Sequence, residues 1–125
     1  MALVRLSFIQ LSAFTANWKR MKLTDGDLRS LENAIAVAPE KSPVMRGTGG
    51  LRKIRFAAAA QSSGKSGGAR ACYAYLPEFQ LVYLCAVYPK NEKANLSAAE
   101  RNDSRKLLEA FRKYLKERWK RGQTP

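Results

Sequence analysis

The stretch of sequence that decides the fold runs from residue 69 to residue 88 and reads ARACYAYLPEFQLVYLCAVY. Its two segments, Ala69 to Leu76 and Phe79 to Tyr88, are rich in Tyr, Val, Leu and Cys, a composition typical of strands. Only the turn at Pro77 and Glu78 separates them. Because strands so close in sequence pair as a hairpin, we expect an antiparallel meander.

Two further strands are expected on the N-terminal side of this hairpin. Residues 51–56 alternate in period 2, which places Lys53 and Arg55 on one strand face and Ile54 and Phe56 on the other. Near the N-terminus, apolar and polar residues also alternate over residues 4–8. This alternation favours a strand over an export signal, whose apolar core would be uninterrupted.

Three helices complete the expected order of elements. Capping-box pairs mark two of their starts, Thr24 with Asp27 and Ser97 with Glu100. Apolar residues at helical spacing mark the buried faces: Phe14, Trp18 and Met21, then Leu28, Leu31 and Ile35, then Leu107, Leu108, Phe111 and Leu115. The order β-α-α-β-β-β-α predicts one α+β domain over residues 1–125, with the helices on one face of a small antiparallel-rich sheet, the other face open, and a basic tail from about residue 116 to 125.

The composition excludes several classes of function. Lys and Arg number 23 against 10 Asp and Glu, a formal net charge of +13, and this basic excess favours a polyanionic partner. The absence of histidine excludes histidine-dependent catalysis and imidazole zinc ligands. Two cysteines, Cys72 and Cys85, are too few for a zinc site or a disulfide scaffold, so we interpret them as buried reduced thiols of a cytoplasmic protein. No run approaches the roughly 18 apolar residues of a membrane span.

The cations are unevenly distributed along the chain. Between Glu40 and Glu78 there is no acidic residue, and the same window holds most of the glycines and seven cations: Lys41, Arg46, Arg52, Lys53, Arg55, Lys65 and Arg70. A surface selected only for solubility would mix both signs, so this window indicates an anion site. The alternative is that these are scattered, solvated charges.

Neighbouring strands would bring Lys53, Arg55, Arg70 and Lys90 into one patch. Such a patch suits cleavage of RNA without metal, because the RNA supplies its own 2′-hydroxyl nucleophile. Arginine stabilises the extra negative charge of the transition state through its planar, permanently ionised fork. Like charges around Lys53 disfavour its charged form, which makes this lysine the candidate general base.

Three motifs occur in the order that is known from one toxin family. They are residues 47–55 (GTGGLRKIR), residues 64–70 (GKSGGAR) leading into Tyr73-Ala74-Tyr75, and residues 88–92 (YPKNE) ahead of Leu96-Ser97. Over roughly residues 43–115 the chain resembles the HigB branch of RelE-type toxins of bacterial type II toxin–antitoxin systems. The resemblance implies an mRNA interferase, an endoribonuclease that cuts translated mRNA in the ribosomal A site by 2′-hydroxyl attack and needs no cofactor or metal.

The same resemblance assigns roles to four residues. Lys53 is then the candidate base, and Arg55 and Arg70 hold and stabilise the phosphate. Lys90 is a phosphate contact or proton donor. Some relatives have site histidines, or an arginine where Asn91 stands, so the general acid stays open, with Tyr88 as a further candidate for stacking or proton donation. Contacts to RNA or the ribosome are expected at Arg52, Lys65, Tyr88, Asn91 and Lys93.

The implied partners are mRNA, the ribosome and a HigA-like antitoxin with a helix-turn-helix domain. The toxin without its antitoxin is expected to be a monomer or a weak homodimer in the cytoplasm. Two other hypotheses remain, because fold alone does not fix function. One is a toxin of the same fold that poisons DNA gyrase, and the other is a non-catalytic module that binds RNA or the ribosome.

Overall fold

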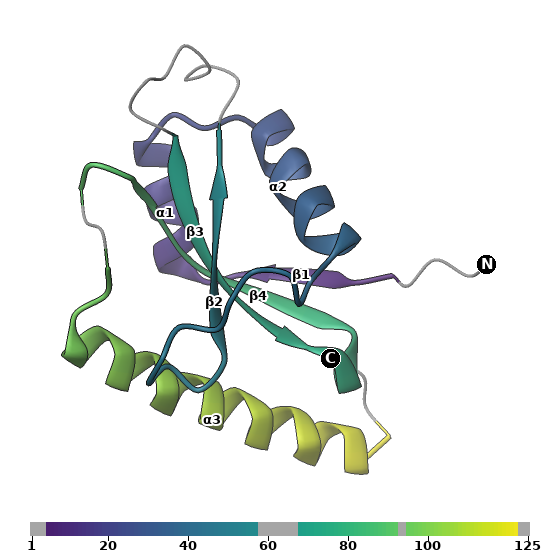
Figure 1. Ribbon diagram of the computed structural model, residues 1–125. Coiled ribbons are helices and arrows are strands. Elements are labelled where there is room, and N and C mark those ends of the chain that lie inside the picture. Colours follow the sequence, from purple (N-terminus) through teal and green to yellow (C-terminus); the bar gives the residue numbers. More distant parts are fainter. Residues whose placement is uncertain (1–4, 58–67, 93–94, 123–125) are drawn as a thin grey trace.

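The computed structural model describes residues 5–57, 68–92 and 95–122, which form a mixed α+β arrangement (Figure 1). The order β-α-α-β-β-β-α that the sequence predicts is confirmed. Its elements are β1 (Ser7–Gln10), α1 (Ser12–Arg20), α2 (Asp25–Val37), β2 (Leu51–Phe56), β3 (Ala69–Leu76), the short 3-10 helix η2 (Pro77–Phe79), β4 (Leu81–Pro89) and α3 (Ala98–Lys120).

The four strands form one sheet in the order β1-β4-β3-β2. The pairs β2–β3 and β3–β4 are antiparallel, so the meander predicted from the hairpin sequence is confirmed. The first strand, β1, instead pairs with β4 in parallel. Because β1 and β2 lie at opposite edges of the sheet, the chain crosses over the sheet between them. Helices α1 and α2 lie within this crossover.

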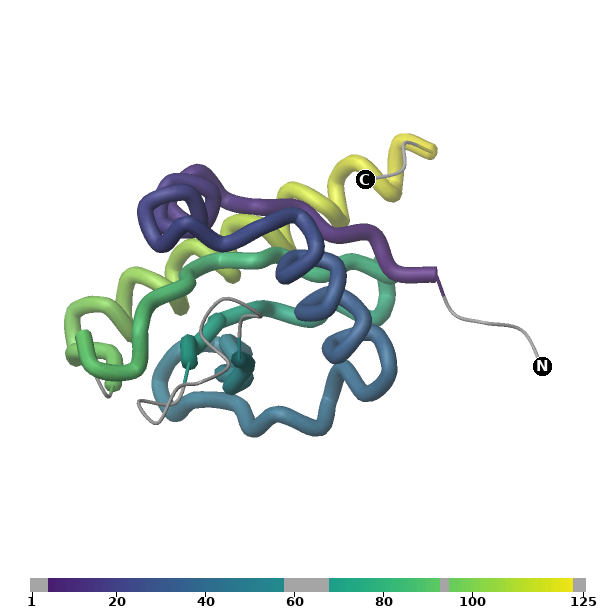
Figure 2. Tube along the Cα trace, turned by 90° about the horizontal axis from the view of Figure 1, so that it is seen from above, coloured from purple at the N-terminus to yellow at the C-terminus, as the bar shows by residue number. Residues whose placement is uncertain are grey.

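Helices cover both faces of the sheet, whereas the sequence predicts them on one face with the other face open. Phe14 and Trp18 of α1 and Leu31 and Ile35 of α2 pack with Tyr73 on one face. On the opposite face, Leu108 and Leu115 of α3 pack against side chains of β2, β3 and β4: Leu51, Cys72, Ala74, Leu76 and Tyr83. In Figure 1, α3 runs along the bottom of the sheet, whereas α1 and α2 lie higher up; Figure 2 shows the same molecule from above. The physical reason is that β3 and β4 are apolar on both faces, and both faces must be covered.

Both predicted capping boxes are present. The Thr24 hydroxyl accepts a hydrogen bond from the Asp27 backbone N–H at 3.0 Å, and the Asp27 carboxylate accepts one from the Thr24 N–H at 2.9 Å. Ser97 and Glu100 make the equivalent pair at 3.1 and 2.8 Å. These caps fix where α2 and α3 begin. Because α3 continues to Lys120, the cations Lys116, Arg118 and Lys120 belong to a helix rather than to a tail.

The turn before β2 is tied to α3. Thr48 is fully buried, and its hydroxyl donates to the Met45 carbonyl oxygen at 2.7 Å and accepts from the Leu51 N–H at 3.0 Å. The Arg101 guanidinium donates to the Arg46 carbonyl oxygen at 2.6 Å. These contacts hold β2 in place as an edge strand. Within the described residues, no helix is both long and apolar enough to cross a membrane.

Candidate functional site

Three strands bring three of the predicted site cations together. Arg55 on β2 pairs directly with Arg70 on β3, and Arg70 pairs with Tyr88 on β4. Paired residues of antiparallel strands have side chains on the same face, so these three lie in one row across the sheet. Lys90 follows β4, and its backbone N–H donates to the Gly68 carbonyl oxygen at 3.2 Å. We name Arg55, Arg70 and Lys90 the cation cluster.

The cation cluster lines an open hollow of about 390 Å³, together with Phe56 and Ala57. None of the described residues that line this hollow is acidic. Arg55 and Lys90 are exposed, whereas Arg70 is only 7% exposed. In Figure 1 the end of β2 and the start of β3 lie at the top of the sheet, above the part that α3 covers. Guanidinium groups in an open hollow without carboxylates suit a phosphate group.

Gly68 holds the edge of this hollow in a geometry that only glycine permits. Its φ is +63°, and a Cβ there would lie 2.3 Å from the Phe56 carbonyl oxygen. The close approach brings the end of β2 and the start of β3 together, and the same residue accepts the hydrogen bond from Lys90. One small residue therefore positions two members of the cation cluster relative to each other.

Tyr88 lies beside Arg70 but is buried, with 2% of its surface exposed. Burial raises the pKa of its phenol to about 12, helped by the nearby Cys72 thiol and a hydrogen bond to it, although the Arg70 charge opposes the shift. The phenol is therefore protonated at neutral pH. Its ring is not presented to solvent, so the position suits support of Arg70 better than stacking on an RNA base.

Lys53 lies next to the cation cluster rather than within it. It lines a second hollow of about 520 Å³ at the edge of β2, together with residues of α2 and of the segment 41–43. Arg55 borders both hollows. The structure thus joins three of the four predicted catalytic residues, whereas Lys53, two residues before Arg55 on β2, borders a separate hollow.

The predicted RNA contacts occupy different environments. The Arg52 guanidinium donates to the carbonyl oxygens of Glu40 and Ser42, at 3.0 and 2.6 Å, so it ties the chain after α2 to β2. Asn91 is exposed in the turn after β4, within reach of solvent beside Lys90. Lys65 and Lys93 lie outside the described residues.

Sequence reasoning missed Phe56 and Ala57, which line the hollow beside Arg55. The available signal was that both residues directly follow Arg55 at the end of β2. It also missed the ion pair of Arg20 with Glu92, at 3.4 Å, which links the end of α1 to the turn that carries Lys90. Both partners are well exposed, so this pair contributes little stability. Among the described residues there is no cluster of acidic and cysteine side chains that could hold a metal ion.

Comparison with known proteins gives a similarity to solved structures. No protein-family model matches the chain. Among solved structures, the chain is similar to a mutant of the E. coli toxin RelE in the free state, with 18% identical residues and a TM-score of 0.49. The similarity covers 70% of this chain and 86% of that chain. It is a similarity of fold, and each residue of the site described above is placed by this chain's own geometry. The HigB branch stays a prediction.

Proposed function

We propose that this protein is the toxin of a type II toxin–antitoxin module and acts as a ribosome-dependent mRNA endonuclease. The observation that carries the proposal is the cation cluster: Arg55, Arg70 and Lys90 converge on one open hollow without a carboxylate among its described lining residues. An RNA phosphodiester brought there would meet two guanidinium groups and one ammonium. The three sequence motifs that resemble those of RelE-type toxins support the same function.

The reaction that suits this site is attack of the RNA 2′-oxygen on the adjacent phosphorus. A bond forms between the 2′-oxygen and phosphorus, the bond from phosphorus to the 5′-oxygen breaks, and a 2′,3′-cyclic phosphate and a 5′-hydroxyl result. Arg55 and Arg70 stabilise the added negative charge. Lys53 takes the 2′-proton, and Lys90 donates a proton to the leaving oxygen.

The ribosome would supply what the isolated site lacks. Lys53 borders a hollow separate from that of the cation cluster, so the RNA must be bent or held for its 2′-hydroxyl to reach Lys53 while its phosphate contacts Arg70. Binding in the A site of a translating ribosome would impose this geometry. The antitoxin that we propose is HigA-like, with a helix-turn-helix domain.

The deciding experiment translates a defined mRNA in a cell-free system and maps new 5′ ends by primer extension. Arg55→Ala is the first variant, because Arg55 is exposed and its loss leaves the core intact. We expect cleavage to fall by about 100-fold or more, the usual effect of removing one transition-state charge contact. Lys19→Ala is the matched control, since it removes one exposed cation from α1 on the opposite face and should cleave like the wild type.

Lys53 needs a different variant, because a basic side chain can act through charge alone. Lys53→Arg keeps the charge but gives a side chain that does not lose its proton in proteins. If Lys53 is the base, Lys53→Arg cleaves no faster than Lys53→Ala. Cleavage by Lys53→Arg at the wild-type rate would remove Lys53 from the proton-transfer role.

Four other results would overturn parts of the proposal. Intact mRNA with arrested translation would mean a non-catalytic ribosome-binding module. Intact mRNA with blocked DNA supercoiling would favour a gyrase poison. Undiminished cleavage in both Arg55→Ala and Arg70→Ala would refute the site assignment. Cleavage of naked RNA at the same rate as ribosomal mRNA would refute the dependence on the ribosome.

A further inference from the structure

The positive charge of α3 is concentrated in its second half. Residues 98–109 contain three cations (Arg101, Arg105, Lys106) and three acids (Glu100, Asp103, Glu109), so their formal charge is zero. Residues 110–122 contain six cations (Arg112, Lys113, Lys116, Arg118, Lys120, Arg121) against Glu117 alone, which gives 6 − 1 = +5. A helix selected only for solubility would mix the signs along its length, so the second half indicates an anionic partner.

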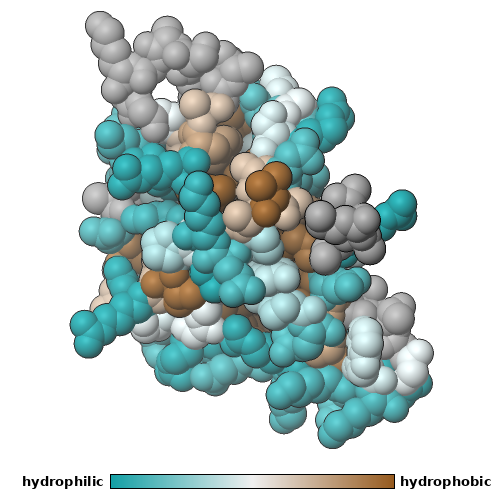
Figure 3. All heavy atoms as spheres, turned by 45° about the vertical axis from the view of Figure 1, so that its right-hand side comes forward, coloured by the Kyte–Doolittle hydropathy of each residue, from teal (hydrophilic) through white to brown (hydrophobic). Residues whose placement is uncertain are grey.

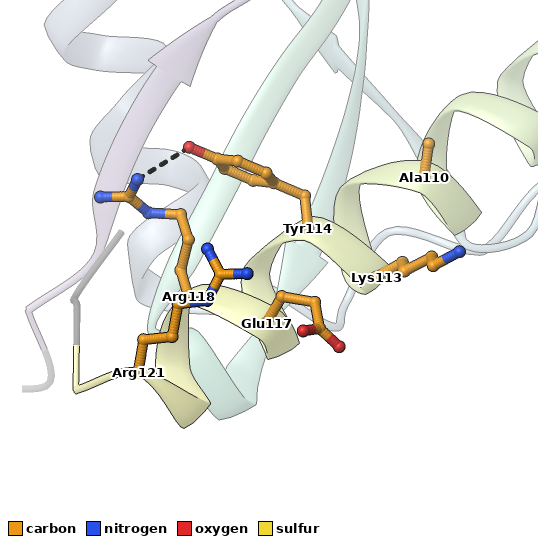
Figure 4. A pocket seen from close by; sticks show the side chains of 6 residues that line it. All are labelled: Ala110, Lys113, Tyr114, Glu117, Arg118 and Arg121. Carbon is orange, nitrogen blue, oxygen red and sulfur yellow. Dashed lines mark hydrogen bonds between the residues drawn. The ribbon is translucent and has the colours of Figure 1, made fainter.

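A hollow of about 390 Å³ lies on the outer face of this second half, shown in Figure 4. The residues that line it recur at helical spacing: Ala110, Lys113, Tyr114, Glu117, Arg118 and Arg121. This face points away from the core face of α3, which carries Leu108 and Leu115. Most of the surface at the bottom of the molecule, where α3 lies in Figure 1, is hydrophilic (Figure 3).

Tyr114 is the aromatic residue in this hollow, and its ring is held in a fixed orientation. The Arg118 guanidinium lies 5.4 Å from the ring centroid and donates a hydrogen bond to the Tyr114 hydroxyl at 3.0 Å (Figure 4). Even so, 55% of Tyr114 is exposed. Trp119 is similarly exposed, but its ring packs edge-on against Phe79 with centroids 5.5 Å apart, so its place in the fold is structural. A large exposed ring with no packing role in the core needs another explanation.

We propose that the face of α3 formed by Lys113, Tyr114, Arg118 and Arg121, here named the α3 stacking surface, is a second RNA-binding site. An unstacked base lies against Tyr114 and Arg118, and Lys113 and Arg121 contact the flanking phosphates. Aromatic rings interleaved with cations are how proteins bind single-stranded nucleic acid without reading its sequence. The proposal deepens the proposed function, since it adds an RNA contact at the end of the molecule away from the cation cluster (Figure 1).

The test uses an RNA that cannot be cleaved, so that binding is measured whether or not the protein is a nuclease. The probe is a fluorescently labelled, unstructured 12-nucleotide RNA with 2′-O-methyl groups, which lacks the 2′-hydroxyl nucleophile. Fluorescence anisotropy gives its Kd for each variant. Tyr114 is exposed, so its replacement leaves the core intact. We expect Tyr114→Ala and Tyr114→Leu to weaken binding at least about fivefold, the lower bound for loss of one stacked base, and Tyr114→Phe to bind within about twofold of the wild type.

The charge contribution is tested with a pair of matched variants on the same helix. Lys113→Ala with Arg121→Ala removes two cations of the α3 stacking surface, and the slope of log Kd against log salt should fall by about 0.7 for each lost phosphate contact. Lys106→Ala, which removes an exposed cation from the neutral half of α3, is the control and should keep the wild-type slope.

Two outcomes overturn the proposal. Wild-type affinity in both Tyr114→Ala and the Lys113 and Arg121 double variant would show that RNA does not bind this face, which would then fit an acidic protein partner. Wild-type affinity in Tyr114→Leu alone would refute stacking. Neither outcome bears on cleavage by the cation cluster, which is measured separately on ribosomes with Arg55→Ala.

Discussion

At the scale of single residues, Arg70 is the most informative side chain. It is 7% exposed and lies in register with a second arginine, Arg55. Burying a guanidinium beside a like charge costs free energy. Proteins retain such an arrangement where a function requires it. We therefore expect Arg70 to reduce stability while it serves the site.

This leads to a stability prediction for Arg70→Met, a replacement of similar volume without charge. We expect the melting temperature, measured by circular dichroism, to stay the same or rise, because replacing buried charge by well-packed apolar groups is often neutral or stabilising. Cleavage on the ribosome should be lost in the same variant. A melting temperature that falls by about 10 °C would identify Arg70 as a structural residue instead.

A second prediction at this scale concerns alkaline pH. Burial raises the pKa of the Cys85 thiol to about 12, with the nearby Cys72 as a lesser cause, and burial also raises the pKa of Tyr88 to about 12. Both groups are neutral in the folded state at a pH where they already ionise in the unfolded chain. Their contribution to the free energy of unfolding is therefore complete below about pH 9 and is lost as pH rises toward 12.

The check is urea unfolding of the wild type and of Cys85→Ala at pH 8 and pH 10.5. The wild type should lose more stability over this interval than the variant, because Cys85→Ala removes the group with the larger shift from its usual value. Equal losses in both proteins would show that Cys85 does not contribute to the alkaline transition.

At the scale of elements, the approach of β2 to β3 depends on Gly68. Gly68→Ala places a Cβ against the Phe56 carbonyl oxygen and forces a left-handed φ of +63° on a residue that disfavours it. We expect the free energy of unfolding to fall by about 1–3 kcal/mol in a urea titration. Cleavage should fall by more than the loss of folded protein explains, since Lys90 and Arg55 both lie at this junction.

Gly26→Ala is the matched control for this substitution. Gly26 lies in the first turn of α2, where an added Cβ would meet only the Thr24 hydroxyl at 3.6 Å. Alanine there should raise the free energy of unfolding by about 0.5–1 kcal/mol, because it restricts the unfolded chain. A Gly68→Ala protein as stable as Gly26→Ala would contradict the structural role assigned to the junction.

The sequence predicts most elements because their signals are local. The Thr24 and Ser97 capping boxes place two helix starts correctly, and the alternation over Leu51–Phe56 gives β2 with its observed bounds. Contacts between distant elements are not encoded in such patterns. The parallel pairing of β1 with β4 depends on a long crossover, and the packing of α3 on the opposite face depends on the second apolar face of β3.

The candidate site is predictable to the same extent and for the same reason. Strand adjacency brings Arg55 and Arg70 together, and adjacency follows from the meander that the sequence indicates. The side-chain environments could not be predicted. Arg52 is engaged by two carbonyl oxygens of the preceding segment, and Lys53 borders its own hollow. A side chain at a sheet edge can contact whichever segment packs there, and the periodicity of the sequence does not predict which segment that is.

At the scale of the whole molecule, the excess of positive charge includes two separate basic surfaces. The cation cluster lies at the end of the sheet that α3 does not cover, and the α3 stacking surface lies near the C-terminus of α3, at the other end of the molecule (Figures 1 and 2). The two share no lining residue. Substitutions at distant sites that share no contacting residues change the binding free energy additively.

This separation predicts the behaviour of a double variant on ribosomes. Arg55→Ala and Tyr114→Ala should each weaken binding of the protein to purified ribosomes in a pelleting assay. In the combined variant, the two losses of binding free energy should add to within about 0.5 kcal/mol. Only Arg55→Ala should also slow cleavage when the protein is saturating, because the α3 stacking surface contributes to binding and not to the reacting phosphate. A double variant no weaker than Arg55→Ala alone would mean that the two surfaces do not bind the ribosome at the same time. The charge of α3 would then serve a different partner from the charge of the cation cluster.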